Sequence, residues 1–286
     1  MLAAIELGGT KTVVAIGNAQ GDIIEECRFP TEDPVATLGF AIDWLRLRGT
    51  PERLGIGSFG PIGITPGTEN YGIFLKTPKA GWSGFSLVEA FRGSLPKCQI
   101  ILETDVNAAA LAEARIGAAT GLEDVAYITI GTGVGAGILS NGRLVHGALH
   151  SEFGHLKVPR APDDAYAGIC PFHQDCLEGL ASGPAMASRW GLPAHQLPAE
   201  HPAWEMEAWY LAHGILSFVA IVCPSRIIVG GGVSQAEGFH EKIKFHLEKI
   251  AAGYFPVVAS PNYVLAPALG QEAGIRGALL LAAEAR

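Results

Sequence analysis

The sequence predicts an α/β protein built from two lobes, and three observations carry this prediction. The 286 residues, 49% of them hydrophobic, suffice for two hydrophobic cores. One pattern of strands and turns occurs twice, about half a chain apart. Between the two copies, an apolar strand leads directly into an alanine-rich helix.

The repeated pattern is strand, glycine turn, strand, polar turn, strand. It occurs first in AAIELGGTKTVVAIGNAQGDIIEECRF and again in VAYITIGTGVGAGILSNGRLVHGAL. Aligning Gly8 with Gly131, an offset of 123, pairs Ile5 with Ile128. Two copies of one unit predict a duplicated fold with a cleft between the lobes.

Each copy ends its first strand in a glycine turn, where phosphates could approach the main chain. Glycine has no Cβ to block that approach, and its N–H groups can form an anion nest. Two tight hairpins without a ligand are the alternative. A third cluster, RIIVGGGVSQAEGF, follows an apolar strand and precedes a helical pattern, as in nucleotide-binding turns. None of the three is a Walker A motif or a spaced G-x-G-x-x-G, which argues against P-loop and Rossmann enzymes.

The candidate general base is Asp105, which lies where the strand CQIILET meets a helix predicted from Val106 to Gly117. A carboxylate here could take the proton of a hydroxyl as phosphoryl transfer proceeds. The alternative is a helix cap, because Asp105 is well placed to accept hydrogen bonds from the first turn.

Composition excludes several classes of partner. A formal charge of −8, with no run of Lys or Arg, argues against nucleic acid or an anionic membrane surface. No apolar run approaches the ~20 residues of a membrane span, and the N-terminus lacks signal-peptide features, so a cytoplasmic protein is expected. Five cysteines do not form a disulfide pattern, and Cys27, Cys98 and Cys223 are expected to be buried as small hydrophobic residues.

A series of motifs along the whole chain resembles the ROK family of sugar kinases, and within it the bacterial fructokinases. In order, they are ELGGTK, GPIG, KTPKAGW, TDVNAAALAE, IGTGVGAGI, SEFGH, CPFHQDCLEGLASGPA and IIVGGGV. The resemblance implies the ribonuclease H-like fold of actin, sugar kinases and heat-shock ATPases. It places a first lobe at residues 1–116 with the C-terminal helix 272–286, and a second lobe at 117–271. The lobes would close over sugar and nucleotide and exclude water.

The resemblance also implies which residues bind Mg·ATP. The phosphates would be lined by Gly8, Gly9, Thr10, Lys11, Gly131, Thr132 and Gly133. The nucleoside side would be formed by Pro184, Gly230, Gly231, Gly232, Val233 and Ser234. Mg²⁺ would bridge the β- and γ-phosphate oxygens and offset charge in the transition state.

For the sugar, the resemblance implies Asp105 as catalytic base and a set of hydroxyl ligands: Thr104, Asp105, Glu152, His155 and Glu178. Two positions depart from the commonest family pattern. Glu6 stands where many members have Asp, and Thr104 stands where glucose-specific members usually have Asn. The second departure, with the fructokinase-like sequences of KTPKAGW and CPFHQDCLEG, favours fructose. The family resemblance implies phosphorylation at O6.

The segment from His150 to Gly179 concentrates histidines and cysteines. With the resemblance, the ligand set for a structural Zn²⁺ is His155, Cys170, His173 and Cys176. Cys-x2-His-x2-Cys puts three donors on one loop, and the upstream histidine closes a four-coordinate shell with no open position. The alternative is two ordinary thiols in a surface loop. His146 and His150 lie off this pattern and are expected to be surface or hinge residues.

Other functions stay open beside an ATP-dependent fructokinase. A glucokinase, mannokinase or N-acetylmannosamine kinase would share the phosphate turns and the zinc loop, and a non-catalytic sugar sensor would share the fold. A repressor of the family needs a DNA-binding segment ahead of the first strand, which begins here at Leu2. The expected partners are a hexose, ATP and a second copy of the chain in a homodimer.

Overall fold

The computed structural model describes residues 1–284, so the last two residues of the predicted helix 272–286 lie outside the described part. The chain forms two compact units. Unit 1 contains Met1–Arg115, Leu144–His150 and the C-terminal segment from Gln271. Unit 2 contains Ile116–Arg143 and Ser151–Gly270. The short segment Leu144–His150, which the sequence assigns to the second lobe, therefore packs with unit 1.

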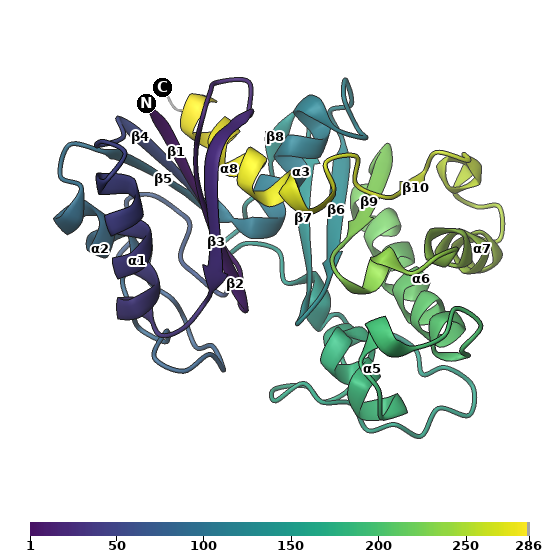
Figure 1. Cartoon of the computed structure of the whole chain (residues 1–286). Helices are drawn as coiled ribbons and strands as arrows, with labels where there is room; N and C mark the ends of the chain where they lie inside the picture. Colours follow the sequence, from purple (N-terminus) through teal and green to yellow (C-terminus); the bar gives the residue numbers. More distant parts are fainter. Residues whose placement is uncertain (285–286) are drawn as a thin grey trace. The chain divides into compact units, whose positions relative to one another are not determined.

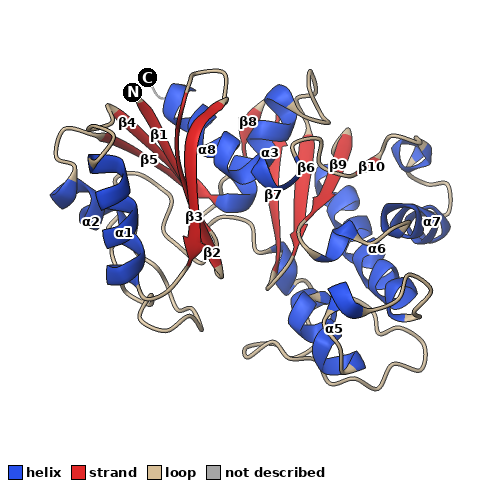
Figure 2. Ribbon diagram, viewed as in Figure 1, coloured by secondary structure: helices blue, strands red, loops and turns tan. Residues whose placement is uncertain are grey.

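Unit 1 is built around a five-stranded sheet in the order β3-β2-β1-β4-β5 (Figures 1 and 2). Its strands are β1 (Leu2–Leu7), β2 (Lys11–Gly17), β3 (Ile23–Pro30), β4 (Arg53–Ser58) and β5 (Gln99–Thr104). Strands β1, β4 and β5 are parallel, whereas β1, β2 and β3 form an antiparallel meander.

Helices cover both faces of this sheet. Figure 1 shows α1 (Pro34–Arg46) and α2 (Leu87–Ser94) on one side and α8 (Ala273–Glu284) on the other. Alternate residues of β1 point to opposite faces of the sheet. Ile5 packs in the core under α1 and α2, while Ala4 packs against α8. The predicted alanine-rich helix is present as α3 (Asp105–Ile116).

Unit 2 repeats the plan with a sheet in the order β10-β9-β6-β7-β8. Its strands are β6 (Val125–Ile130), β7 (Val134–Ser140), β8 (Arg143–Leu144), β9 (Arg226–Gly230) and β10 (Val264–Leu265). Its helices are α4 (Leu177–Ala181), α5 (Gly183–Trp190), α6 (Ala203–Val222) and α7 (Phe239–Ala251). Short 3₁₀ turns lie at Phe153–His155, Ala194–Gln196, Val233–Gln235 and Pro256–Ala259. Another, at Gly270–Glu272, spans the boundary between unit 2 and unit 1 and leads into α8.

The two sheets have the same topology. Replacing β1 to β5 by β6 to β10 converts one strand order into the other, and the parallel and antiparallel pairs correspond. The α/β fold with a duplicated unit, predicted from the glycine-turn repeat, is therefore confirmed.

The parallel strands bring the candidate residues of each unit to one sheet edge. In unit 1, Leu7 is in register with Ser58, and Ser58 with Thr104, so the first glycine turn and Asp105 follow the ends of strands two positions apart. In unit 2, Thr129 pairs with Gly230, so the second and third glycine clusters follow neighbouring strand ends. Ligand sites of open α/β sheets lie at this carboxyl edge.

Among residues 1–284, no helix has both the length and the apolar character needed to cross a bilayer.

Candidate functional site

The first glycine turn joins β1 to β2 and is held from one side by Thr31. Gly8 N–H donates to Lys11 O at 3.0 Å and closes the turn. The Thr31 hydroxyl donates to Gly8 O at 2.7 Å, and its N–H donates to Thr10 O at 2.9 Å. The two carbonyls of the turn are therefore fixed by one buried residue at the end of β3.

The two glycines of this turn are required for different reasons. A Cβ on Gly8 would lie 2.8 Å from Lys11 O, so the fold itself needs glycine there. A Cβ on Gly9 would meet no atom within 4 Å. The open side of Gly9 is where a phosphate can approach the main chain.

Asp105 is the first residue of α3, and the alternative role as helix cap falls to its neighbour. Thr104 Oγ1 accepts the Asn107 N–H at 3.1 Å, the usual bond of an N-cap side chain. Asp105 Oδ1 accepts the N–H of Val106, the next residue, at 2.9 Å. Thr104 is buried while Asp105 is half-buried. The cap is thus supplied by Thr104, which leaves Asp105 the better candidate for chemistry.

Glu103 is a functional candidate that sequence reasoning missed. It is buried, and its Oε1 accepts the Thr104 N–H at 2.8 Å and the Asn107 amide at 2.9 Å. Its Oε2 lies 2.6 Å from His146 Nε2, and this hydrogen bond raises the pKa of His146. The available signal was an acid inside an apolar strand, which needs a partner when buried.

The two histidines set aside as surface or hinge residues have specific partners. His146 binds Glu103, as above, although its side chain is 42% exposed. His150 is buried, and its Nε2 accepts the Ile62 N–H at 3.2 Å in the GPIG segment. Of the two expectations, surface or hinge, the surface position is therefore wrong for His150, and the hinge position stays a prediction. These bonds fasten Leu144–His150 to unit 1.

Glu6, the departure from the family's Asp, fits because of a glycine on α8. A Cβ on Gly274 would lie 2.5 Å from the Glu6 Cδ, so only glycine leaves room for the longer side chain. Burial raises the pKa of the Glu6 carboxyl.

The second glycine turn joins β6 to β7 and is braced by α4 and α5. Gly131 N–H donates to Gly133 O at 2.9 Å, and Gly183 N–H, at the start of α5, donates to Gly131 O at 2.8 Å. Glu178 Oε2 accepts the Val134 N–H at 3.0 Å. Glu178, assigned from the resemblance to the sugar, thus also holds the exit of this turn.

The glycines of the second turn divide in the same way as those of the first. A Cβ on Gly133 would lie 2.5 Å from Glu178 Oε2, whereas a Cβ on Gly131 would meet nothing within 4 Å. Gly131 therefore marks the open side of this turn, as Gly9 does in unit 1.

The third glycine cluster packs against the end of β6. Gly231 has φ of +91°, and a Cβ there would lie 2.3 Å from Ile130 O. Ser234 Oγ donates to Gly231 O at 2.9 Å within the short turn Val233–Gln235. Pro184 occupies the first turn of α5, which begins one residue earlier at the Gly183 bonded to the second turn. The residues predicted for the nucleoside side are therefore neighbours of the second glycine turn.

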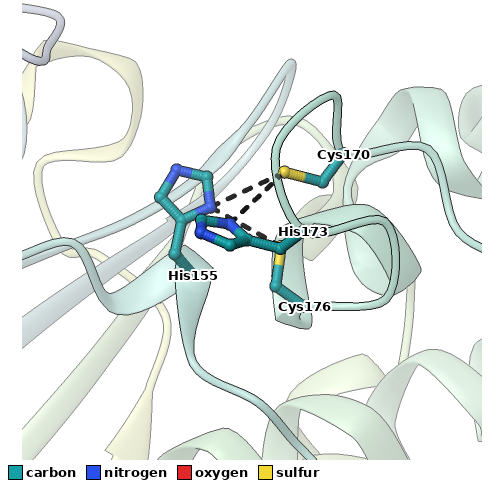
Figure 3. A group of neighbouring side chains, drawn as sticks. All are labelled: His155, Cys170, His173 and Cys176. Carbon is teal, nitrogen blue, oxygen red and sulfur yellow. Dashed lines mark hydrogen bonds between the residues drawn. The ribbon is translucent and has the colours of Figure 1, made fainter.

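The four predicted zinc ligands come together in unit 2 (Figure 3). Their ligand atoms all lie within 4.8 Å of one another: His155, Cys170, His173 and Cys176. Two backbone bonds between Cys170 and Gln174, at 3.2 and 2.9 Å, fold the loop so that its donors converge. Asp175, between the ligands, forms an ion pair with Lys157.

The spacing of these atoms fits a tetrahedral metal. Bonds of about 2.3 Å to sulfur and about 2.0 Å to nitrogen at tetrahedral angles give sulfur–nitrogen separations of about 3.5 Å. The Cys170 Sγ lies 3.8 Å from His155 Nδ1 and 3.7 Å from His173 Nδ1, and Cys176 Sγ lies 3.5 Å from His155 Nδ1. Two sulfurs and two imidazoles are a donor set for Zn²⁺.

Two contacts, one from Gly154 and one from Glu178, place the four-residue His/Cys cluster beside the second glycine turn. A Cβ on Gly154, the residue before His155, would lie 2.0 Å from Val134 O. Glu178, two residues after Cys176, accepts the Val134 N–H. The other nitrogen of His155, Nε2, lies 3.9 Å from Glu152 Oε2, which places both predicted sugar ligands at the edge of the cluster.

The remaining cysteines differ from expectation. Cys27 and Cys98 are half-buried, and Cys223 is exposed, so full burial is wrong for all three. Cys223 ends α6 in the left-handed region with φ of 48°, a terminal position that apolar neighbours in the sequence do not reveal.

Comparison with known proteins places these sites in a family. Residues 2–285 match the ROK family, and the chain belongs to it. A fructokinase from Pediococcus pentosaceus is 38% identical, over 99% of this chain and 97% of its own. A fructokinase from Zymomonas mobilis is 37% identical, over 97% of this chain and 95% of its own.

Solved structures show the same fold. The crystal structure of a ROK family glucokinase from Streptomyces griseus, in complex with glucose and AMPPNP, has a TM-score of 0.78 and 25% identity. The match covers 99% of each chain. The two-lobed kinase fold predicted from the sequence is thus confirmed.

Proposed function

We propose that this protein is an ATP-dependent fructokinase that transfers the γ-phosphoryl group of Mg·ATP to the 6-hydroxyl of D-fructose. The observation that carries the proposal is the sheet edge of unit 1, where a glycine turn with an open side and the Asp105 carboxylate follow parallel strands in register. Relatives that carry the name fructokinase at 37% and 38% identity along nearly the whole chain support the choice of sugar.

The spacing of the two groups suits phosphoryl transfer. Two strand positions at about 4.8 Å each separate the turn from Asp105 by about 10 Å. This separation leaves room for a terminal phosphate bound at Gly9 and for a sugar hydroxyl within hydrogen-bond reach of Asp105. Main-chain N–H groups then hold the phosphate while a carboxylate faces the acceptor.

In the proposed reaction, Asp105 accepts the proton of the fructose 6-hydroxyl as its oxygen bonds to the γ-phosphorus. The bond from that phosphorus to the bridging oxygen breaks, and ADP leaves with the bonding electron pair. Thr104 and Glu103 keep the first turn of α3 in place through the cap bond and the bond to the Thr104 N–H. Mg²⁺ offsets charge on the phosphates.

In unit 2, the proposal assigns the second and third glycine clusters to the nucleotide, and Glu152, His155 and Glu178 to the sugar. Zn²⁺ is proposed as a structural ion on the four-residue cluster. It would fix the His155 ring through Nδ1, so that Nε2 is held as a hydrogen-bond donor for a sugar hydroxyl. A cytoplasmic homodimer is proposed from the family resemblance, and light scattering after size exclusion tests the dimer.

The experiment that tests the function is an ADP-release assay with Mg·ATP and, separately, fructose, glucose, mannose and N-acetylmannosamine. Turnover dominated by fructose is expected. Asp105→Asn should lower turnover by about 10²- to 10⁴-fold, the usual contribution of a general base, while Mg·ADP still binds. Turnover of D105N within tenfold of the wild type would show that another group takes the proton. A preference for another hexose would replace the substrate and keep the mechanism.

A further inference from the structure

A hydrogen-bonded chain connects the KTPKAGW segment with the first glycine turn through Thr31. Thr31 is buried, and its hydroxyl has a single hydrogen, which it donates to Gly8 O. The hydroxyl of Thr12, which is fully buried and 2.8 Å away, must then donate to Thr31 Oγ1. On its other side, the Thr31 carbonyl accepts Lys79 Nζ at 3.0 Å.

The bonds of Thr31 determine which way the N–H groups of the turn point. In a trans peptide unit, the C=O and the following N–H point in opposite directions. Because Gly8 O and Thr10 O are both fixed to Thr31, the N–H groups of Gly9 and Lys11 are turned away from it. That is the orientation an anion nest requires.

The segment that carries Lys79 is anchored at the same place by a second contact. Trp82, fully buried, donates its indole N–H to Glu32 O at 2.9 Å, one residue beyond Thr31. A Cβ on Gly81 would lie 3.2 Å from the Pro34 ring, so the segment lies close along residues 31–34. A shift of this segment would therefore reach the phosphate turn through Thr31.

We propose that Thr31 is a positioning residue for the nucleotide phosphates and that Lys79 connects it to the 76–82 segment. Thr31 touches no reacting atom in this proposal; it acts by orienting the turn. The inference rests on the proposed function for the identity of the anion, a nucleotide phosphate.

The test measures binding of Mg·ADP by titration calorimetry on the full chain without sugar, together with the KM values for ATP and fructose. Thr31→Val keeps the shape and removes the hydroxyl, so the Gly8 carbonyl and the Thr12 hydroxyl both lose this partner. The Kd for Mg·ADP should therefore rise about tenfold. The KM for ATP should rise with it, while the KM for fructose changes less than threefold. Thr31→Ser restores the hydroxyl and should bind within about threefold of the wild type.

Thr37→Val is the matched control. Thr37 is equally buried, and its hydroxyl accepts the Glu32 N–H at 2.9 Å, but it makes no bond to the turn. It should lower thermal stability without changing the Kd. Lys79→Met, at a half-buried position that should not prevent folding, should raise the Kd about threefold.

The outcomes separate this inference from the proposed function. Wild-type protein that binds Mg·ADP but phosphorylates no hexose would defeat the function and leave the Thr31 comparison intact. If T31V, or K79M where T31V does not fold, binds Mg·ADP like the wild type, the positioning role is wrong. Equal weakening by T31V and T37V would also overturn it, because the effect would then be general destabilisation.

Discussion

The two glycine turns occupy equivalent places in equivalent sheets, yet they are built differently. In unit 1, Leu7 pairs with Thr12 and four residues form the turn, whereas in unit 2, Ile130 pairs with Val134 and three residues form it. The first turn is braced by the hydroxyl and N–H of Thr31. The second is braced by a carboxylate and by the N-terminus of α5.

The difference shows where each turn takes its rigidity from. The Thr31 brace belongs to the sheet itself, at the end of β3, and needs no added ion. The Glu178 brace directly follows the loop that contains Cys170, His173 and Cys176, because Cys176 precedes α4 and Glu178 lies in its first turn. The two units therefore share the strand order and the open glycine, but different residues stabilise the turn in each unit.

Removal of the proposed zinc ion is expected to have the largest effect, and this effect should be confined to unit 2. Cys176→Ser should abolish binding of the proposed Zn²⁺ and destabilise unit 2 by more than about 4 kcal/mol, as loss of a structural metal does. Hydrogen exchange should then accelerate at the Val134 and Gly183 amides. The Thr31 amide, which donates to Thr10 O, should stay protected.

Exposed Cys223→Ser is the control for loss of a thiol, and zinc content is read by elemental analysis. Unchanged exchange at Val134 in protein shown to be free of zinc would mean that the second turn does not depend on the metal. Equal acceleration in both turns would erase the contrast between the units.

The next effect is expected from the glycines of the first turn. Gly8→Ala places a Cβ 2.8 Å from a backbone oxygen that cannot move alone, so it should cost about 1–3 kcal/mol. Gly9→Ala meets open space and should leave stability the same or raise it by about 0.4–1 kcal/mol. The Kd for Mg·ADP should nevertheless rise in G9A, since its methyl group would face the phosphates. Urea unfolding and calorimetry check both variants, and a G9A protein that binds normally would place the phosphates elsewhere.

In the second turn, too, replacing the packed glycine should cost stability and replacing the open glycine should not, but the two variants should differ less in stability than those of the first turn. Gly133→Ala would push away Glu178 Oε2, the end of a flexible side chain, and lose its bond to Val134, at about 1 kcal/mol. Gly131→Ala should be neutral for stability and harmful to Mg·ADP binding. If G133A acts through Glu178, its effect and that of Glu178→Ala should not add in a double-mutant cycle. Additive effects would indicate an independent cause.

Much of this architecture could be predicted from local patterns. The alternation of apolar residues around glycine predicted the hairpins, and the strand-to-helix boundary at Asp105 predicted α3. The spacing of three donors, together with the family resemblance, predicted the cluster. Each of these signals lies within about 25 residues, where chain connectivity limits the possible arrangements.

The contacts of Glu103 and Glu178 could not be predicted because they join distant residues. The Glu103 carboxylate meets His146 from 43 positions away, and Val134 meets Glu178 from 44. The requirement for Gly154 arises from Val134 O, which no local pattern reveals. Glycine in a turn predicted an open approach, but in each of the first two turns one glycine, Gly8 or Gly133, serves internal packing instead.

The smallest predicted effect concerns the Glu103–His146 pair of unit 1. The stability of this unit should depend on pH through His146. The hydrogen bond to Glu103 raises the pKa of His146, so protonation of this histidine is more favourable in the folded state. Its stabilisation is therefore complete below the unfolded pKa of about 6.5 and is lost as pH rises through the higher folded pKa. Because 42% of the side chain is exposed, solvent screening limits the effect to a few tenths of a kcal/mol. Urea unfolding at pH 6 and pH 8.5 should show a smaller difference in His146→Gln than in the wild type, and identical differences would mean that the Glu103 pair does not titrate in this range.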